Sequence, residues 1–259
     1  MRGKATHPEA RNRERCLARA YAFLARGDMY GSRSAPSTVG TAVYLDELPR
    51  RLDANFLHVE REAEADEIEA EARRLERRMI FVPDTELGER IAPYFAKRGW
   101  RVNRVIVMAQ RREPELRVEL GRVEEVPEEE LRPARARLNA GQPWGAPEVM
   151  EQLFAGKHVI GRLMEARFFA VKVDGEVVSY TDLYQDGAGA QIEDVGTLPE
   201  HRGHGYATAV VLTAIAAARE NGAEFVFLVA DYEDWPKKWY ERLGFDELGY
   251  YVKFVAPNT

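Results

Sequence analysis

The segment Arg202-Gly203-His204-Gly205-Tyr206-Ala207 decides both the fold of this chain and its chemistry. It joins a predicted strand, Gln191 to Leu198, to a helix from Tyr206 to Glu220 whose apolar residues recur on one face. The first backbone N–H groups of a helix have no partner within it, and the helix dipole favours negative charge there. The two glycines carry no side chain that would block an anion, and the arginine adds positive charge. We therefore expect a phosphate site at this turn.

Other glycine loops also bind phosphates, and the spacing here argues against two of them. A P-loop closes with Gly-Lys-Ser or Gly-Lys-Thr, and neither tripeptide follows this strand. A dinucleotide fingerprint needs a third glycine where Thr208 stands. No Ser, Thr, Asp or Asn occupies the position that would cap the helix, which indicates that a ligand serves the free amides.

Composition limits the remaining possibilities. The chain has 259 residues, 45% of them hydrophobic and 31% charged, which is typical of a globular protein. A net charge of −6 argues against nucleic acid as a partner, because a binder must neutralise phosphates. Cys16 is the only cysteine, so no internal disulfide forms, and no Cys/His cluster has zinc spacing. No apolar run suits a signal peptide or a membrane span, and we expect a cytoplasmic protein without membrane contact or bound metal.

Periodicity and turn residues predict alternating helices and strands in the first half of the chain. Three helices are predicted here: Cys16 to Leu24, Ala63 to Arg78, and Leu87 to Arg98. The predicted strands are Thr41 to Leu45, Asn55 to Val59, Ile80 to Val82 and Trp100 to Met108. The segment from Gly31 to Gly40 is rich in Gly, Ser and Pro and is predicted to be a loop.

The second half has a similar alternation. Its predicted helices are Glu128 to Leu138, Pro147 to Phe154, Tyr206 to Glu220 and Trp235 to Leu243. Its predicted strands are Leu116 to Val123, Arg167 to Val173, Val177 to Tyr184, Gln191 to Leu198, Phe225 to Ala230 and Phe245 to Val255.

Both halves share the order strand, helix, strand, helix and then a glycine-aromatic step into the last strands. The step is Gly99-Trp100 in the first half and Gly244-Phe245 in the second. This order predicts an internal repeat whose first copy lacks the glycine loop. We expect two domains, a degenerate one over residues 1–112 and a catalytic one over residues 113–259. The alternative is two unrelated α/β segments.

The glycine segment matches the pattern Arg or Gln, two residues, Gly, one residue, then Gly or Ala, with Arg202, Gly205 and Ala207 in the fixed positions. With the strand Glu193-Asp194-Val195-Gly196-Thr197 before it and Tyr240-Glu241-Arg242-Leu243-Gly244-Phe245 after it, the region from Leu116 to Val255 resembles the GNAT superfamily of acyl-CoA-dependent N-acyltransferases. The resemblance implies a mixed α/β (α+β) GNAT fold, here present twice. In this fold helices flank a mostly antiparallel central sheet whose central strands splay apart.

The resemblance also implies which residues hold the donor, acetyl-CoA. The backbone of Val195, Gly196 and Thr197 would bind the pantetheine arm. The pyrophosphate would lie against Arg202, Gly203, His204, Gly205, Tyr206, Ala207 and Thr208. Gly196 is either the bulge that starts the splay or a glycine required by packing. The sequence departs from the family at Glu233, where asparagine often stands, which puts contacts to the pantetheine in doubt.

In the family's chemistry an amine attacks the thioester directly in a ternary complex. Such an amine must lose a proton, and a carboxylate is the natural base. Strand alternation places Glu193 on one face and Asp194 on the other, and we favour Glu193 as the base over its reading as an exposed or ion-paired residue. Tyr240 matches a tyrosine that protonates the leaving thiolate, and its alternative role is packing. Trp144 falls in the region that shapes the acceptor pocket in this fold.

The expected function is N-acetyl transfer from acetyl-CoA to a primary amine. The acceptor is a small molecule, a peptide or a protein, since no motif selects among them. The competing class is a non-catalytic acyl-CoA-binding regulatory module. A monomer or a homodimer is expected.

Overall fold

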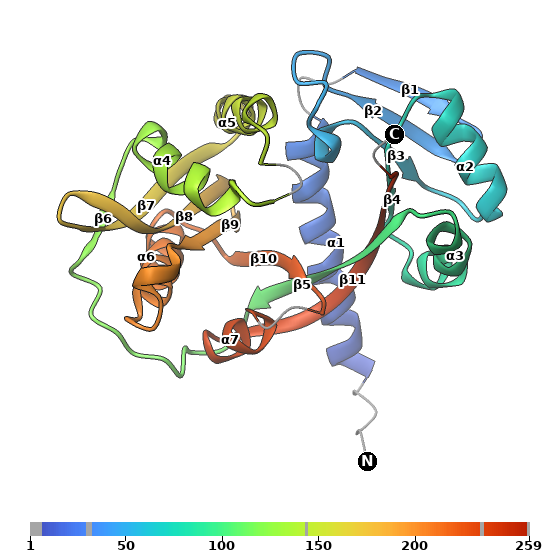
Figure 1. Ribbon diagram of the computed structural model, residues 1–259. Coiled ribbons are helices and arrows are strands. Elements are labelled where there is room, and N and C mark those ends of the chain that lie inside the picture. Colours follow the sequence, from blue (N-terminus) through green and yellow to red (C-terminus); the bar gives the residue numbers. More distant parts are fainter. Residues whose placement is uncertain (1–6, 30–32, 143–144, 234–235, 258–259) are drawn as a thin grey trace.

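The computed structural model describes residues 7–29, 33–142, 145–233 and 236–257, and it is built on one mixed sheet of 11 strands (Figure 1). The strand order is β1-β2-β3-β4-β11-β5-β10-β9-β8-β7-β6. The strands are β1 Arg33–Ser37, β2 Gly40–Tyr44, β3 Phe56–Val59, β4 Met79–Val82, β5 Arg101–Gln110, β6 Val123–Glu125, β7 Glu165–Val173, β8 Glu176–Asp186, β9 Gly189–Thr197, β10 Phe225–Asp231 and β11 Phe245–Val255. The helices are α1 His7–Met29, α2 Ala65–Arg74, α3 Thr85–Lys97, α4 Glu128–Asn139, α5 Pro147–Gly161, α6 Tyr206–Glu220 and α7 Pro236–Arg242, with 3-10 turns at Leu52–Ala54 and Pro199–His201.

The pairing of the strands shows the same order in both halves, here taken as β1 to β5 and β6 to β11. β3 pairs with β4 in parallel across the crossover helix α2, and β9 pairs with β10 in parallel across α6. The other neighbouring strands are antiparallel. The predicted order of strand, helix, strand, helix and strand is therefore present twice, in a mixed and mostly antiparallel sheet.

The last strand of each half lies against the other half. β5 follows α3 in the first half but pairs with β10 of the second, while β11 pairs with β4 of the first. β5 and β11 also pair with each other from Arg101↔Val255 to Gln110↔Phe245, and they lie side by side at the centre of the sheet (Figure 1). The two halves therefore exchange strands. The predicted division between residues 112 and 113 follows β5 directly and stays a prediction.

The central strands are apolar on both faces because helices cover both faces. In β5, Val107 and Ala109 pack with α1, while Ile106 and Met108 belong to the core beneath α6. A strand buried on both faces shows an uninterrupted apolar run instead of alternation. In the first half, α2 and α3 cover the sheet, and the rings of Phe95 and Phe254 stack at 4.5 Å, which joins α3 to β11. The core of the first half thus contains a strand from the end of the chain.

Two segments differ from the sequence-based expectation. The predicted loop from Gly31 to Gly40 contains β1, an edge strand in a hairpin with β2. The predicted strand from Leu116 to Val123 is wrong, because residues 116–122 pair with no strand and end in a turn at Gly121 and Arg122, just before β6 begins at Val123. The apolar residues of this segment alternate with polar ones for another reason: Leu116 packs on the core, and Val118 lies at the glycine turn, close to Gly205. None of the described helices is long and apolar enough to cross a membrane.

The strand exchange predicts that the halves need each other to fold. Cutting the chain between Leu120 and Gly121, an exposed stretch, would give one fragment without β11 and another without β5. Each would expose unpaired sheet edges and uncovered apolar surface. We expect either fragment alone to aggregate or to lack a cooperative unfolding transition, and the co-expressed pair to copurify in equal amounts. Cooperative unfolding of the fragment 1–120 by itself, followed by circular dichroism, would contradict this prediction.

Candidate functional site

The site begins where the two parallel strands of the second half separate. β9 and β10 pair from Gly189↔Phe225 to Ile192↔Leu228, and the pairing ends there although both strands continue. The segment Glu193–Thr197 therefore has no β10 partner on that edge and pairs only with β8. The predicted splay of the central strands is confirmed. Backbone groups on the open edge are available to a ligand.

A bulge in β9 changes which side chains face which side. The register between β8 and β9 shifts between Tyr180↔Gly196 and Asp182↔Glu193, and Asp194 has a left-handed φ of 51°. Glu193 and Asp194 consequently line the same pocket. The expectation that alternation places them on opposite faces is wrong, because the extra residue of a bulge interrupts the alternation. Gly196 is a packing glycine, since a Cβ there would overlap the Tyr180 ring.

The glycine turn lies at the N-terminus of α6 and leaves the first amides of that helix without a side-chain cap. Gly203 and Gly205 have left-handed φ values of 81° and 79°, which other residues rarely adopt. Gly205 is the N-cap, and no side chain caps the helix. The Arg202 Nε–H donates to the carbonyl of Thr197 at 3.3 Å, so the turn is tied to the end of β9.

The equivalent crossover helix of the first half is unsuited to anions. α2 carries Asp66 and Glu67 in its first turn, whereas α6 has no acidic residue there. Acidic side chains near the N-terminus interact favourably with the positive end of the helix dipole, by about 0.3–1 kcal/mol each, and they repel a bound anion. Of the two β–α–β crossovers, only that of the second half keeps the charge properties of an anion site.

A pocket of about 370 Å³, here called the glycine-loop pocket, lies against this turn. It is lined by Val195, Gly196, Thr197, His201, Arg202, Gly203, Gly205, Tyr206, Ala207, Thr208, Pro236, Trp239 and Tyr240. No carboxylate occurs among these described lining residues, which suits a polyanion. Of the residues predicted to hold the donor, His204 alone is not in this lining; it is exposed, and its ring stacks on Tyr206 at 5.5 Å.

Tyr240 forms part of the wall of the glycine-loop pocket. Its side chain is 8% exposed and packs edge-on against Phe245, and the neighbouring Trp239 donates a hydrogen bond to Thr208 at 3.2 Å. Burial raises the pKa of the Tyr240 hydroxyl, and the nearby negative charge of Glu193 raises it further. The hydroxyl therefore stays protonated at neutral pH and is a hydrogen-bond donor.

A second pocket of about 290 Å³, here called the junction pocket, is formed by both halves. Phe23 of α1 and Phe81 of β4 line it together with Lys157 of α5 and the pair Glu193 and Asp194 of β9. Since β9 contributes Val195 to Thr197 to the glycine-loop pocket, the strand passes from one pocket to the other at its bulge.

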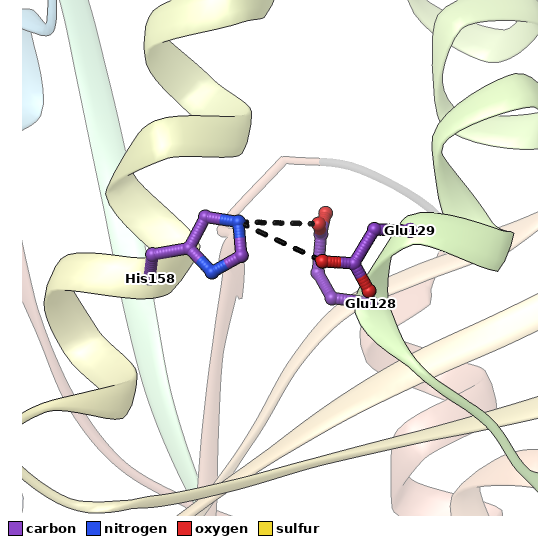
Figure 2. Close-up of side chains that lie close together, drawn as sticks. All are labelled: Glu128, Glu129 and His158. Atoms are coloured by element: carbon purple, nitrogen blue, oxygen red, sulfur yellow. Dashed lines mark ion pairs between the residues drawn. The ribbon is translucent and has the colours of Figure 1, made fainter.

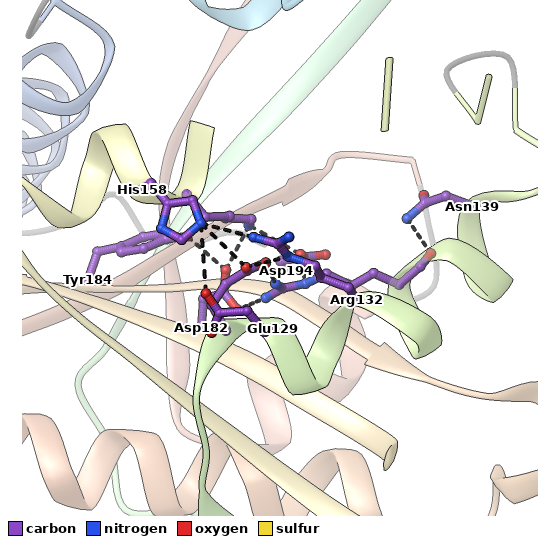
Figure 3. Close-up of polar contacts among 10 residues, drawn as sticks. Glu129, Arg132, Asn139, His158, Asp182, Tyr184 and Asp194 are labelled. Carbon is purple, nitrogen blue, oxygen red and sulfur yellow. Dashed lines mark hydrogen bonds and ion pairs between the residues drawn. The ribbon is translucent and has the colours of Figure 1, made fainter. Parts of the chain in front are cut away.

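Beneath the junction pocket lies a buried network of charged residues (Figure 3). Asp182 is fully buried; it accepts from Lys157 at 2.7 Å and from the Tyr184 hydroxyl at 2.7 Å, and it is also ion-paired with Arg135. Arg135, which is 2% exposed, also contacts Asp194 at 2.9 Å, and Lys157 contacts Asp194 at 3.1 Å. The bulge of β9 is thus fixed by two cations.

The network gives the two adjacent carboxylates different properties. Burial opposes ionisation of Asp194, yet Lys157 and Arg135 lower the pKa of Asp194 below its ordinary value. Glu193 accepts instead from the Gln191 amide at 2.7 Å. Burial raises the pKa of Glu193 to about 7; Lys157 opposes this rise, while the charges of Asp194 and Asp182 add to it. Asp194 is therefore a fixed anion, and Glu193 exchanges a proton near neutral pH.

Glu128, Glu129 and His158 form a cluster with the spacing of a metal site (Figure 2). The cluster already holds a cation, because Arg132 donates to Glu128 at 2.8 Å and lies 2.9 Å from the His158 Nε2. Glu129 and His158 are exposed. We interpret the cluster as a set of ion pairs at the edge of the buried charged network around Asp182.

The sequence did not indicate the junction pocket. Arg135 and Lys157 lie on helices where charged residues ordinarily face solvent, and only the packing of those helices on the sheet buries them. Trp144, predicted to shape the acceptor pocket, and Trp235, predicted to begin α7, lie outside the described residues.

Comparisons with known proteins agree with this geometry. Residues 131–245 match the model of the acetyltransferase (GNAT) family. No curated protein matches the sequence significantly.

Solved structures similar to this chain include two that are 15% identical to it and come from named organisms. They are a functionally unknown conserved protein from Staphylococcus epidermidis (TM-score 0.63, 88% of this chain and 95% of that one) and a GCN5-related N-acetyltransferase from Kribbella flavida (TM-score 0.59, 94% and 96%). A tandem GNAT protein from the clavulanic acid biosynthesis pathway, also 15% identical, has a TM-score of 0.53 over 95% of this chain and 97% of that one. At this identity the likeness concerns the fold.

Proposed function

Because this chain belongs to the GNAT superfamily of acetyltransferases, we propose that it transfers an acetyl group from acetyl-CoA to the primary amine of an acceptor. The observation that carries the proposal is the separation of β9 from β10, with an anion-binding turn on one side and a titratable carboxylate on the other. The glycine-loop pocket receives the donor, and the junction pocket receives the acceptor.

The glycine-loop pocket fits a coenzyme A. The uncapped amides of α6, Arg202 and the absence of carboxylates from the described lining favour a pyrophosphate. The open edge of Val195 to Thr197 offers backbone donors and acceptors to the amides of a pantetheine arm, as a sheet edge does to an added strand. These properties belong to the second half, so the first half has another role, which is to complete the junction pocket.

In the proposed reaction the free amine of the acceptor attacks the carbonyl carbon of the thioester. A carbon–nitrogen bond forms, the carbon–sulfur bond breaks, and the electron pair of that bond leaves with the coenzyme sulfur. Glu193 accepts the proton that the nitrogen loses, directly or through water, because its pKa of about 7 suits a base at neutral pH. Such a base beside the donor pocket favours a transferase over a module that only binds acyl-CoA.

We assign Tyr240 to the leaving sulfur. A coenzyme thiol is as acidic as cysteine, with a pKa of about 8.5, so its thiolate is a tolerable leaving group even without a proton. The raised pKa of Tyr240 makes complete proton transfer to that thiolate unfavourable. The hydroxyl therefore acts by donating a hydrogen bond to the developing negative charge, and the thiolate takes its proton from solvent.

The donor pocket is tested by adding a carboxylate to the glycine turn. Gly203 and Gly175 both have left-handed φ values, 81° and 83°, and a Cβ at either position would have no neighbour within 4 Å. Gly203→Glu and Gly175→Glu therefore impose a similar backbone strain, but only the first places negative charge at the pyrophosphate. We expect Gly203→Glu to weaken coenzyme A binding by at least about 100-fold in calorimetry, and Gly175→Glu to leave it unchanged. Equal affinities in the two variants would exclude this turn as the site.

The role of Glu193 is tested by the pH dependence of kcat/KM. A base with a pKa of about 7 is protonated and inactive below that pH, so we expect the rate to fall as the pH drops through 7. Glu193→Gln should remove this inflection and lower turnover by roughly 10²–10⁴-fold, with coenzyme affinity unchanged. Asp194→Asn, the matched variant, should retain the inflection, because Asp194 is held ionised by Lys157 and Arg135. An inflection that persists in Glu193→Gln would assign the base elsewhere.

Tyr240→Phe separates catalysis from packing. The ring and its contact with Phe245 remain, so we expect the free energy of unfolding to change by less than about 1 kcal/mol. Turnover at saturating acetyl-CoA should fall by about 100-fold because the sulfur loses its hydrogen-bond donor. Undiminished turnover would show that the residue only packs α7 against the sheet.

A further inference from the structure

The junction pocket has room for one small molecule that contains an aromatic ring. Its volume is about 290 Å³, and its described lining comes from α1, β3, β4 and the segment around Arg51 in the first half and from α4, α5, β8, β9, β10 and β11 in the second. A cavity of about 150 Å³ in an apolar core binds benzene. A pocket of roughly twice that volume therefore holds a ring, or a branched alkyl group, together with a short chain.

One stripe of α5 faces the junction pocket. Its members recur at intervals of three and four residues, which places them on one side of the helix: Met150, Leu153, Phe154, Lys157 and Ile160. Met150, Leu153 and Phe154 belong to none of the hydrophobic cores that the described residues form. The apolar surface of these three side chains is therefore available to a ligand in the pocket.

The remaining apolar wall is largely aromatic. It includes Phe23 of α1, Phe81 of β4 and Tyr251 of β11, and the rings of Phe81 and Tyr251 lie 4.7 Å apart. Phe81 is half-buried, so part of its side chain is accessible. Aromatic side chains offer a large apolar area and pack well against another ring. Burial of apolar surface against this wall favours a ligand with an aromatic or alkyl body.

Most charged side chains of the described lining are engaged with one another. Arg51 forms an ion pair with Asp53 through both carboxylate oxygens. Asp194 is held by Lys157 at 3.1 Å and by Arg135 at 2.9 Å. A ligand that broke one of these buried pairs would leave an uncompensated charge behind, which is strongly unfavourable. These groups therefore do not favour a second charge on the ligand.

Glu193 is the acid of this wall that suits the amine of a ligand. The residue is half-buried, and among the described residues its carboxylate accepts a hydrogen bond from the Gln191 amide, at 2.7 Å. A carboxylate has about four acceptor positions, so an amine N–H finds one there. Lys253 is engaged with the acids of the wall, since its charge lowers the pKa of Asp53 and opposes the rise in the pKa of Glu193.

We propose that the acceptor is a hydrophobic primary monoamine, whose amine lies at Glu193 and whose aromatic or alkyl body lies against the α5 stripe and the aromatic wall. This inference rests on the proposed function for the identity of the junction pocket as the acceptor site. The nitrogen forms its bond to the acetyl carbon, the coenzyme sulfur leaves, and the product is a neutral N-substituted acetamide.

The inference narrows the acceptor class in two ways. A second charged group on the ligand would lie against apolar surface without a partner or would compete with the ion pairs of the wall. The lysine side chain of a protein has a narrow unbranched stem, which would leave part of a pocket with room for a ring unfilled.

The first test follows the rate along a series of straight-chain amines from propylamine to heptylamine, with phenethylamine as the aromatic member. Coenzyme A binding is first measured by calorimetry, and kcat/KM is then measured by thiol release with the acetylated product identified by mass. We expect kcat/KM to rise by about fourfold for each added methylene until the pocket is full. Rates within twofold of each other across the series would overturn the inference.

The second test adds a charge at the far end of the same body. Pentylamine is compared with 1,5-diaminopentane, and phenethylamine with 4-(2-aminoethyl)benzoate. We expect either charged compound to react at least about 100-fold more slowly than its partner, because the added charge would have to leave water. A diamine, an amino acid or a lysine peptide that reacts best would overturn the inference and leave the proposed function standing.

The variant Leu153→Trp fills part of the pocket from α5. We expect it to shorten the alkyl chain at which kcat/KM is highest by at least about two methylenes, while coenzyme affinity is unchanged. Glu151→Trp changes an exposed residue of the same helix outside the described lining and should leave the preferred length unchanged. If Leu153→Trp does not fold, Leu153→Ala enlarges the pocket and should lengthen the preferred chain. A preferred length that is the same in all folded variants would contradict the assignment.

Failure of the proposed function has a different signature, which is the absence of coenzyme A binding and of thiol release with every amine; the inference then falls with it. If the coenzyme binds but no amine reacts, binding of each compound to the coenzyme-loaded protein is measured by saturation-transfer NMR. Hydrophobic amines that bind where their charged partners do not support the site, and an absence of binding by all the hydrophobic amines overturns it.

Discussion

The pairing of β5 with β11 is the constraint on which the rest of the structure depends. These strands come from different halves, and each lies beside a strand of the other half, so neither half completes its sheet alone. The exchange brings β4 and the segment around Arg51 to the same pocket as β9 and α5. A junction pocket between two copies of one fold follows from this exchange, and α1 covers the seam where the central strands meet (Figure 1).

The bulge of β9 is the second point where geometry determines chemistry. A non-glycine residue in the left-handed region costs of order 1 kcal/mol or more and persists only when its surroundings hold it. Here Lys157 and Arg135 hold the Asp194 carboxylate, and Tyr180 fills the space beside Gly196. Glu193 accepts its hydrogen bond from the neutral Gln191 amide, and burial has the largest effect on the pKa of Glu193. One buried network thus fixes the strand and separates the properties of two adjacent acids.

The two copies of the fold have diverged in what their crossover helices present. α6 begins with an uncapped turn and no acidic side chain, whereas α2 begins with Asp66 and Glu67. One copy keeps the charge properties of an anion site, and the other contributes part of the wall of the junction pocket.

Local patterns in the sequence predicted most of the helices and strands and the uncapped glycine turn before α6. The helix Tyr206–Glu220 was predicted with its observed bounds, because its apolar face, its glycines and its terminator are all local. The repeated order was likewise readable from the two glycine-aromatic steps. Only the tertiary structure decided the exchange of β5 and β11, because a run of apolar residues does not specify which strand it pairs with. The tertiary structure also decided that Asp194 lines the same pocket as Glu193 and that Arg135 and Lys157 are buried. A bulge and a buried ion pair depend on residues far apart in the chain, so local patterns do not predict them.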